Sequence, residues 1–229
     1  MTPPAEISEL SPRAVLWDMD GTLLDSAEFH WLSWREVMAA EGREMSHEHF
    51  LTTFGRRNDA ILRGLFGDDF PDGEVVRIAT AKEERYRALA LAGSVEPLPG
   101  VRAWLARLRA DGWRQAIASS APHLNIAAIA EALGFDGAFD AVVGDEDVRH
   151  GKPDPEVYLT AAARLGVAPA RCVVVEDAAA GIEGARRAGM RSIAVGPDHA
   201  DHGADLAVAT LDLLPADAFN RLVAPVSPG

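Results

Sequence analysis

The amino-acid sequence predicts an α/β protein with a parallel sheet and an inserted block of helices. Three observations carry this prediction: a short apolar strand lies near the N-terminus, a long helical pattern follows it, and helices then alternate with strands after Gly100. Strands that alternate with helices are typical of βαβ units, whose strands pair in parallel. The helical block interrupts this order, so we expect a core over 1–25 and 97–229 and an all-helical unit over 26–96.

The N-terminal part contains one strand and then only helical patterns. Residues 13–17 form a largely apolar run that ends at a glycine-containing loop, as expected for a buried strand. Over 26–91 the apolar residues recur at helical spacing, as at Trp31, Trp34 and Met38.

Prolines mark the next boundaries. Pro71 begins a long helix that we expect to run through Tyr86, and the stretch Pro97-Leu98-Pro99-Gly100 ends the helical block. Beyond it the pattern predicts a Rossmann-like alternation, with helices over 101–110, 122–133, 155–165 and 178–188, strands over 114–118, 139–143, 171–175 and 191–195, and an edge strand over 205–209.

The charge of the 229-residue chain limits its partners. The chain has 22 Lys and Arg against 35 Asp and Glu, a net charge of −13. Such a field repels nucleic acid, and it repels small phosphate esters unless a local positive site binds them. The single cysteine, Cys172, excludes an internal disulfide and favours a reducing compartment.

Targeting signals are not evident in the sequence. Residues 1–10 are expected to form a loose polar leader, and no apolar stretch approaches the roughly 18 residues of a membrane span. We therefore expect a cytoplasmic protein with neither nucleic acid nor membrane as a partner. The sequence does not indicate an oligomeric state.

Chemically reactive residues gather near the ends of four predicted strands, where open parallel sheets bind their ligands. The first group is Asp18-x-Asp20-Gly21. Residues two apart in an extended chain face the same side, so both carboxylates can enter one site. Two adjacent carboxylates require a cation or a proton between them. The alternative is a solvated acidic turn.

The second group is Ser119-Ser120 before Pro122. Hydroxyl and backbone N–H groups at a helix start can bind an anion, although either serine could simply cap the helix. The third group is Gly151-Lys152-Pro153-Asp154-Pro155. Only Lys82 and Lys152 are lysines among the 22 basic residues, so a functional role for Lys152 is favoured over a solvent-exposed one.

The fourth group is Glu176-Asp177, which follows the apolar run 173–175 and precedes a helix. The two acids could stabilise the helix dipole. They could equally supply carboxylate oxygens to Mg²⁺, which prefers one or two carboxylates together with water and phosphate.

The order of these four groups resembles that of the haloacid dehalogenase superfamily. The stretch from Asp18 to Ser26 is similar to its first motif, and Gly151 to Pro155 is almost as diagnostic. The resemblance covers nearly the whole chain and implies the HAD fold with residues 26–96 as its helical cap. It also implies that Asp18 is the nucleophile and forms an aspartyl-phosphate, and that Asp20 is a general acid and base.

The resemblance further implies a magnesium site and a phosphate site. Mg²⁺ would be held by Asp18, Asp177, the main-chain carbonyl of Asp20 and Glu176, directly or through water. Ser119 and Lys152 would hold the transferring oxygens. True dehalogenases lack an acid two residues after the nucleophile, because a halide leaves without protonation, so Asp20 favours phosphoryl transfer over dehalogenation.

The predicted cap resembles the β-phosphoglucomutase branch of the superfamily. In that branch a histidine at the cap hinge corresponds to His30, and a basic cap loop follows a glycine, here Gly55. The predicted substrate-binding residues are His30, Gly55, Arg56, Arg57, Ser120 and His123. The two arginines lie one or two positions early relative to the branch and could instead form an exposed helix start, and His30 could be a packed core residue.

The favoured function is a Mg²⁺-dependent phosphatase that hydrolyses a small organic phosphate ester, with sugar phosphates among the candidates. The alternative is a β-phosphoglucomutase-like isomerase, which returns the phosphoryl group to the sugar. A third reading, a non-catalytic phosphate-binding module, requires that a catalytic group be missing, whereas all the motif residues are present.

Overall fold

The computed structural model describes residues 12–197 and 199–223, so the predicted leader over 1–10 lies outside the described residues. Six parallel strands form one sheet in the order β3-β2-β1-β4-β5-β6. Their bounds are β1 Ala14–Trp17, β2 Arg114–Ala118, β3 Ala141–Val143, β4 Cys172–Glu176, β5 Arg191–Ala194 and β6 Leu206–Ala207. The predicted fold class is confirmed, and the first strand joins the later ones at the centre of the sheet.

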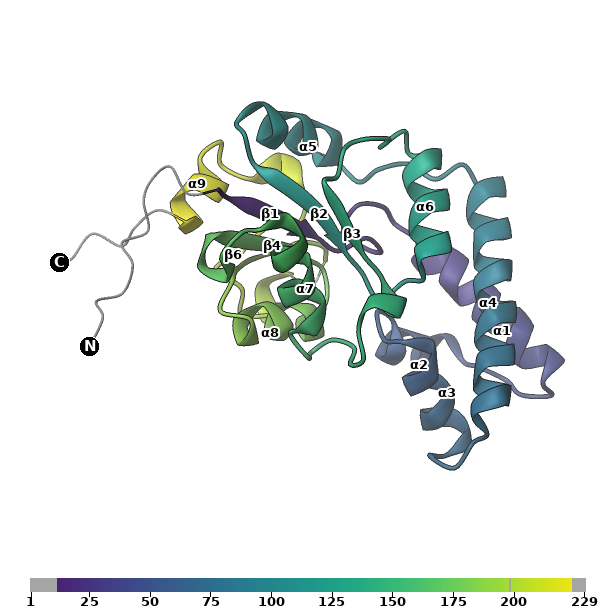
Figure 1. The fold of residues 1–229 in the computed structure, drawn as a ribbon. Helices are drawn as coiled ribbons and strands as arrows, with labels where there is room; N and C mark the ends of the chain where they lie inside the picture. The colour runs from purple at the N-terminus through teal and green to yellow at the C-terminus, as the bar shows by residue number, and fades with distance from the viewer. Residues whose placement is uncertain (1–11, 198, 224–229) are drawn as a thin grey trace, which may run out of the picture.

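The central strands are apolar on both faces because helices cover both. Along β1, Val15 and Trp17 belong to one core cluster, whereas Ala14 and Leu16 belong to the other. On the first face lie α5 Val101–Ala110, α6 His123–Ala132 and α9 Ala218–Val223; on the second lie α7 Glu156–Leu165 and α8 Ala179–Arg187. Figure 1 shows this layering, with α5 on one side of the strands and α7 and α8 on the other.

Four strands are shorter than the sequence predicts: β1 and β5 by one residue, and β3 and β6 by more. Aspartate side chains lie directly before the first residues of β3 and β6. β3 begins at Ala141 because Asp140 uses its carboxylate to accept the N–H of Gln115, 2.8 Å away. β6 covers Leu206–Ala207, since Asp205 accepts the N–H of Ser192 and pairs with Arg191. In each case a carboxylate, in place of a backbone carbonyl, accepts an N–H of the neighbouring strand just before the short strand begins.

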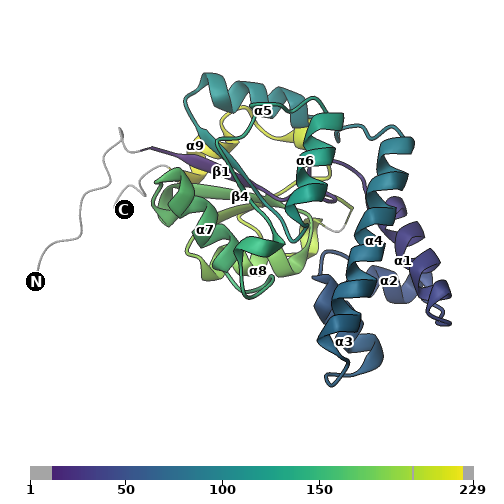
Figure 2. The same cartoon turned by 45° about the vertical axis from the view of Figure 1, so that its right-hand side comes forward.

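The helical block follows β1 and packs around its own core. Its helices are α1 Ala27–Ala40, α2 His47–Thr53, α3 Asn58–Phe66 and α4 Asp72–Ala92, and residues 26–96, all of them described, contain no strand. Trp34, Met38, Phe50 and Leu62 are buried within this block. Figure 2 shows these four helices together beside the core, with α4 next to α6 of the core.

The two chain segments that join the block to the core run side by side. Leu24 forms an isolated antiparallel bridge with Pro97, and the N–H of Leu98 donates to the carbonyl of Leu23 at 2.9 Å. Pro71 precedes α4, which runs beyond the predicted Tyr86 to Ala92. Among the described residues no helix is long and apolar enough to cross a membrane.

Candidate active site

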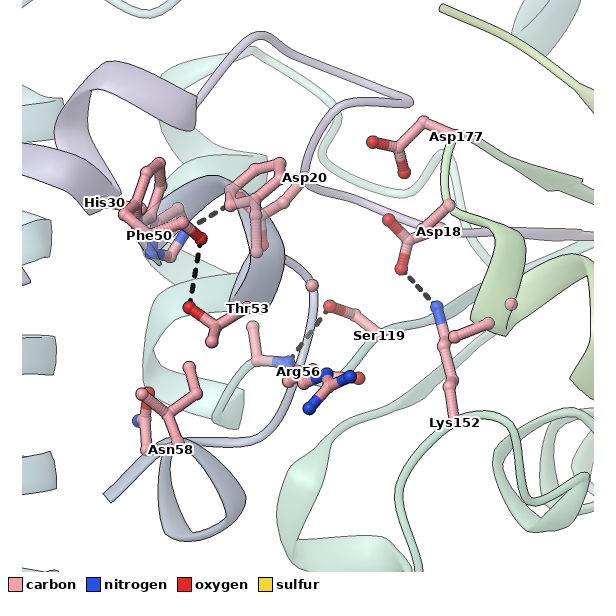
Figure 3. Close-up of a pocket in the computed structure, with 18 of the residues that line it drawn as sticks. Asp18, Asp20, His30, Phe50, Thr53, Arg56, Asn58, Ser119, Lys152 and Asp177 are labelled. Atoms are coloured by element: carbon pink, nitrogen blue, oxygen red, sulfur yellow. Dashed lines mark hydrogen bonds and ion pairs between the residues drawn. The ribbon is translucent and has the colours of Figure 1, made fainter. Parts of the chain in front are cut away.

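The four predicted groups meet at the carboxyl ends of β1, β2 and β4. A cavity of about 360 Å³ lies there, between the sheet edge and the helical block. The core contributes Asp18, Asp20, Ser119, Ser120, Lys152, Glu176 and Asp177 to its lining, and the block contributes His30, Gly55, Arg56, Asn58, Lys82 and Glu83. Figure 3 shows the labelled residues of both parts pointing into the same space.

Three carboxylates are crowded at the core side of this cavity. Asp18, Glu176 and Asp177 each have an oxygen within 4.8 Å of the others. Burial raises the pKa of Asp18 to about 7 although Lys152 opposes this rise, and burial together with Glu176 and Asp18 raises that of Asp177 well above its usual range. Such a cluster is stabilised by a bound cation, and hard carboxylate oxygens suit Mg²⁺.

Two glycines make room for these acids. A Cβ on Gly21 would lie 2.0 Å from Oδ2 of Asp177, and the backbone there has φ +81°, a conformation that glycine adopts without cost. A Cβ on Gly181 would lie 1.9 Å from Oε1 of Glu176. The acids therefore occupy space that any other residue at these two positions would fill.

Lys152 is the positive centre of the core side. Its Nζ lies 2.5 Å from Oδ1 of Asp18 and 2.5 Å from Oε1 of Glu176. Burial opposes its charge, but Asp18 and Glu176 outweigh burial and hold its pKa well above the usual range. The hydroxyl of Tyr158 donates to the same Oε1 at 3.1 Å. Lys152 thus stays charged in a buried site, next to the candidate nucleophile.

Asp20 points the other way, toward the helical block. Its Oδ1 accepts hydrogen bonds from Ser26 at 2.6 Å and Tyr86 at 3.1 Å, and Nε2 of His30 lies 3.2 Å away. Burial opposes ionisation of Asp20, but its interactions with His30, Ser26 and Lys82 outweigh burial and lower its pKa to about 2. The carboxylate of Asp20 is not part of the metal-type cluster, so its predicted contribution there is limited to the main-chain carbonyl.

His30 is oriented by a residue that the sequence analysis passed over. Nζ of Lys82 lies 2.7 Å from Nδ1 of His30 and 2.9 Å from Oε1 of Glu83. An ammonium group can only donate, so Nδ1 accepts and the ring proton sits on Nε2, facing Asp20. Tyr86 stacks on the ring, with centroids 3.9 Å apart. Lys82 is one of only two lysines, the signal that had singled out Lys152.

The helix start at the second group is not capped by a serine. α6 is preceded by Pro122, and the N–H of its first residue, His123, donates to the carboxylate of Glu146 at 3.0 Å and not to a serine. Ser119 is buried, and its Oγ accepts the N–H of Ala121 at 3.1 Å. Ser119 and Ser120 both line the cavity, which leaves them available to an anion.

The two cap arginines differ. Arg56 is exposed and lines the cavity, and its side chain has no hydrogen-bond or ion-pair partner among the residues that the structure describes. Nη1 of Arg57 instead lies 2.9 Å from Oδ1 of Asp145, away from the cavity. His123 also turns away, because its Nε2 pairs with Asp147 at 2.6 Å. The structure therefore does not bring Arg57 and His123 to the predicted substrate site.

This site defines a class of enzyme: an α/β enzyme with buried carboxylates and a lysine beyond the strand ends, covered by helices. The chain matches the sequence model described as "Hydrolase: haloacid dehalogenase-like hydrolase" over residues 12–189. It belongs to this family, as the motifs of the sequence indicated.

The chain is similar to both phosphatases and a phosphomutase of this family. It is 35% identical to fructose-1-phosphate phosphatase YqaB of Escherichia coli, over 79% of this chain and 95% of that one. It is 32% identical to β-phosphoglucomutase of Bacillus subtilis, over 88% and 93%. A solved structure of a CbbY variant from Rhodobacter sphaeroides with xylulose-(1,5)-bisphosphate has a TM-score of 0.80 and 29% identity, with 89% and 96% covered. The predicted enzyme class is thereby supported.

Proposed function

We propose that the protein is a Mg²⁺-dependent phosphatase that hydrolyses a small sugar phosphate through an aspartyl-phosphate on Asp18. The observation that carries this proposal is the second carboxylate, Asp20, which lines the cavity and accepts hydrogen bonds from Ser26 and Tyr86 of the helical block. An alkoxide leaving group needs a proton, and Asp20 is placed to supply it. One similar protein is named as a fructose-1-phosphate phosphatase, and a variant of another was crystallised with xylulose-(1,5)-bisphosphate. Both support this substrate class.

The two parts of the molecule have separate roles in this proposal. Residues 26–96 are the cap, which shapes the substrate site, and 1–25 with 97–229 are the catalytic core. The large apolar side chains that line the cavity, including Trp34 and Phe54, come from the cap. The cap therefore selects the organic part of the ester, while the core binds the phosphoryl group.

Asp18 attacks phosphorus, and its neighbours make that attack feasible. Two anions repel each other, so positive charge must lie between the nucleophile and the ester. Lys152 supplies one charge at 2.5 Å from Asp18. The crowded acids Asp18, Glu176 and Asp177 fit a magnesium ion, which would neutralise further charge on the phosphoryl oxygens. Ser119 donates its hydroxyl to a phosphoryl oxygen.

Asp20 acts in both halves of the reaction. Its carboxylate form, favoured by its lowered pKa, is the form that deprotonates the water attacking the aspartyl-phosphate. In the first half it must carry a proton, and the negative charge of the arriving phosphate raises its pKa in that direction. His30, with Nε2 3.2 Å from Asp20, orients the carboxylate toward the leaving oxygen.

The cap side of the cavity binds the rest of the substrate. Arg56 has no partner among the described residues and lines the cavity, so it is free to bind a polar tail. Gly55, with φ +80°, allows the turn that presents it. Ser120 offers a hydroxyl from the core side. The proposed partner is a small phosphorylated metabolite in the cytoplasm, with no nucleic acid or membrane.

The second candidate is a β-phosphoglucomutase-like isomerase, favoured by the identity to the Bacillus subtilis enzyme. Both candidates form an aspartyl-phosphate and differ in the acceptor of the phosphoryl group. The deciding experiment measures inorganic phosphate released from sugar phosphates, nucleotides and phosphoglycolate with added Mg²⁺. Rapid release from one class supports the phosphatase. Conversion of β-glucose 1-phosphate to the 6-phosphate with little phosphate released would replace it by the mutase.

A further inference from the structure

Arg57 was expected at the substrate and is instead bound to the core. It precedes α3 in the helical block, and its side chain is 20% exposed. Nη1 lies 2.9 Å from Oδ1 of Asp145 and donates to the carbonyl of Val148 at 3.2 Å. Both partners belong to the segment 145–151, which follows β3 and leads directly into Lys152. One cap side chain thus spans two points of the segment that carries the catalytic lysine.

The methylene groups of Arg57 make a third contact, at Gly151. A Cβ on Gly151 would lie 2.6 Å from Cδ and 3.0 Å from Cγ of Arg57. The φ of Gly151 is not in the left-handed region. A glycine is therefore favoured here because it has no side chain, and not because of its backbone freedom. The glycine before Lys152 is therefore explained by an arginine that lies flat across it.

Charge makes the contact specific. Burial, opposed by the cation Arg57 and assisted by the nearby acids Asp59, Glu146 and Glu83, raises the pKa of Asp145 to about 6. A carboxylate in such surroundings is costly without a close cation. Because this cation comes from the cap, the favourable arrangement of the 145–151 segment depends on the cap lying against the core.

The core fixes the same segment only in part. The N–H groups of Arg149 and His150 donate to Glu156 at 2.9 and 3.0 Å, and Asp147 pairs with Arg164. These contacts anchor the middle of the segment to α7 and its surroundings, and at its start the backbone N–H of Asp145 donates to the carbonyl of Ala121 at 3.0 Å. Arg57 adds contacts at its start and at its last residue, next to Lys152.

We propose that Arg57 is a positioning residue: it clasps the segment 145–151 and thereby sets Lys152 against Asp18 when the cap is closed. The proposal rests on the proposed function, since it takes Lys152 to hold a phosphoryl oxygen. It links cap closure to the catalytic lysine without any contact between Arg57 and the substrate.

A double-mutant cycle tests the clasp. Arg57→Ala, Asp145→Ala and the double variant are assayed for phosphate release from the best ester found with Mg²⁺. We expect each single variant to lower kcat about tenfold, as small misplacements of catalytic groups do, with KM changed by less than about twofold. The double variant should be no worse than either single one, because both remove the same contact.

The neighbouring arginine is the matched control. Arg56→Ala should raise KM with a smaller effect on kcat, since Arg56 lines the cavity. If Arg57 bound substrate, Arg57→Ala would raise KM in the same way, Asp145→Ala would leave kcat intact, and the two effects would add. That pattern would overturn the proposal. Arg57→Lys should recover only part of kcat, because an ammonium keeps the charge but cannot replace both Nη1 and the Nε that donates to Asp59 at 3.3 Å.

Amide hydrogen exchange provides a measurement that needs no substrate. Arg57→Ala and Asp145→Ala should each speed exchange across 145–152, whereas Arg56→Ala should not. If no ester releases phosphate, the proposed function fails while exchange still reports the clasp. Unchanged exchange in both variants would overturn the clasp. Faster exchange with an unchanged kcat would overturn the positioning of Lys152.

A glycine variant checks the close approach. Gly151→Ala should displace Arg57 and reproduce the faster exchange of Arg57→Ala. In the Arg57→Ala background the same alanine should have little further effect, because its clash partner is gone. A full effect of Gly151→Ala without Arg57 would show that the glycine serves another purpose and would count against the clasp.

Discussion

Asp18 and Asp20 are two residues apart and both largely buried, yet their surroundings shift their pKa values in opposite directions. Asp18 lies on the core side among Glu176 and Asp177, and its pKa is raised to about 7. Asp20 lies on the cap side among donors from Ser26 and the block, and its pKa is lowered to about 2. Environments that separate the pKa values of paired acids are typical of acid and base assignments in enzymes.

The comparison shows what each part of the chain contributes. The core gathers acids, which are unfavourable together until a cation joins them, and this arrangement suits the proposed metal site. The helical block supplies Tyr86 and His30 and, behind them, Lys82. Without the block, Asp20 would lack His30 and Lys82, two of the groups that lower its pKa. Insertion of the helices after β1 thus makes two different roles out of one short motif.

The largest expected effect is at Asp18. Replacing it by Asn removes the nucleophile, so Asp18→Asn should lower Mg²⁺-dependent phosphate release at least about 10⁴-fold. Activity is measured on the best ester, and a cooperative thermal transition like that of the wild type confirms folding. Turnover that survives the substitution would mean that Asp18 does not attack phosphorus.

Asp20 should be the next most sensitive position. Asp20→Asn keeps the shape but cannot transfer a proton, so kcat should fall about 10²–10⁴-fold. The loss should shrink for esters with good leaving groups, such as aryl phosphates, because they need less protonation. Equal losses for alkyl and aryl esters would argue against a general acid at this position.

Lys82 tests the cap side of the comparison. It is 2% exposed and paired with Glu83, which Asn58 and Asn125 also contact. Lys82→Met leaves Glu83 buried without its cation, so the free energy of unfolding should fall by about 3 kcal/mol, measured by urea titration with tryptophan fluorescence. The double variant Lys82→Met/Glu83→Gln should recover part of the loss. A loss under about 1 kcal/mol would show that this pair is effectively solvated.

Much of the fold could be predicted because periodicity and turn residues are local signals. The buried run at 13–17, the helical spacing at Trp34 and Met38 and the proline at 71 each specify an element through neighbours in sequence. The first residues of β3 and β6 could not be predicted, because the side chains of Asp140 and Asp205 accept hydrogen bonds from N–H groups of neighbouring strands.

The core side of the site could also be predicted from the sequence. Parallel strands end at one edge, so residues after β1 and β4 had to meet, and Lys152 stood out by its rarity. The positions of the Arg57 and His123 side chains could not be predicted. They depend on ion pairs with Asp145 and Asp147, which are distant in sequence and are not indicated by any local pattern.

The smallest effect sharpens the difference between the two acids through pH. Metal ligands must be deprotonated, so Mg²⁺ competes with the proton on Asp18. With a pKa of about 7, Asp18 is mainly charged at pH 8 and mainly protonated at pH 6, and Mg²⁺ affinity should fall roughly tenfold over this interval. Asp20, with a pKa of about 2, remains charged throughout and contributes nothing to the change.

Calorimetric titration of Mg²⁺ at pH 6, 7 and 8 measures this dependence directly. Asp20→Asn should keep the slope of the wild type, because the titrating group is elsewhere. Asp18→Asn should bind Mg²⁺ more weakly but with a shallower slope, the remainder coming from Asp177, whose pKa is also raised. An affinity for Mg²⁺ that does not change from pH 6 to 8 would mean that Asp18 and Asp177 are ionised throughout, as Asp20 is. The core side and the cap side would then differ in geometry and not in the pKa values of their acids.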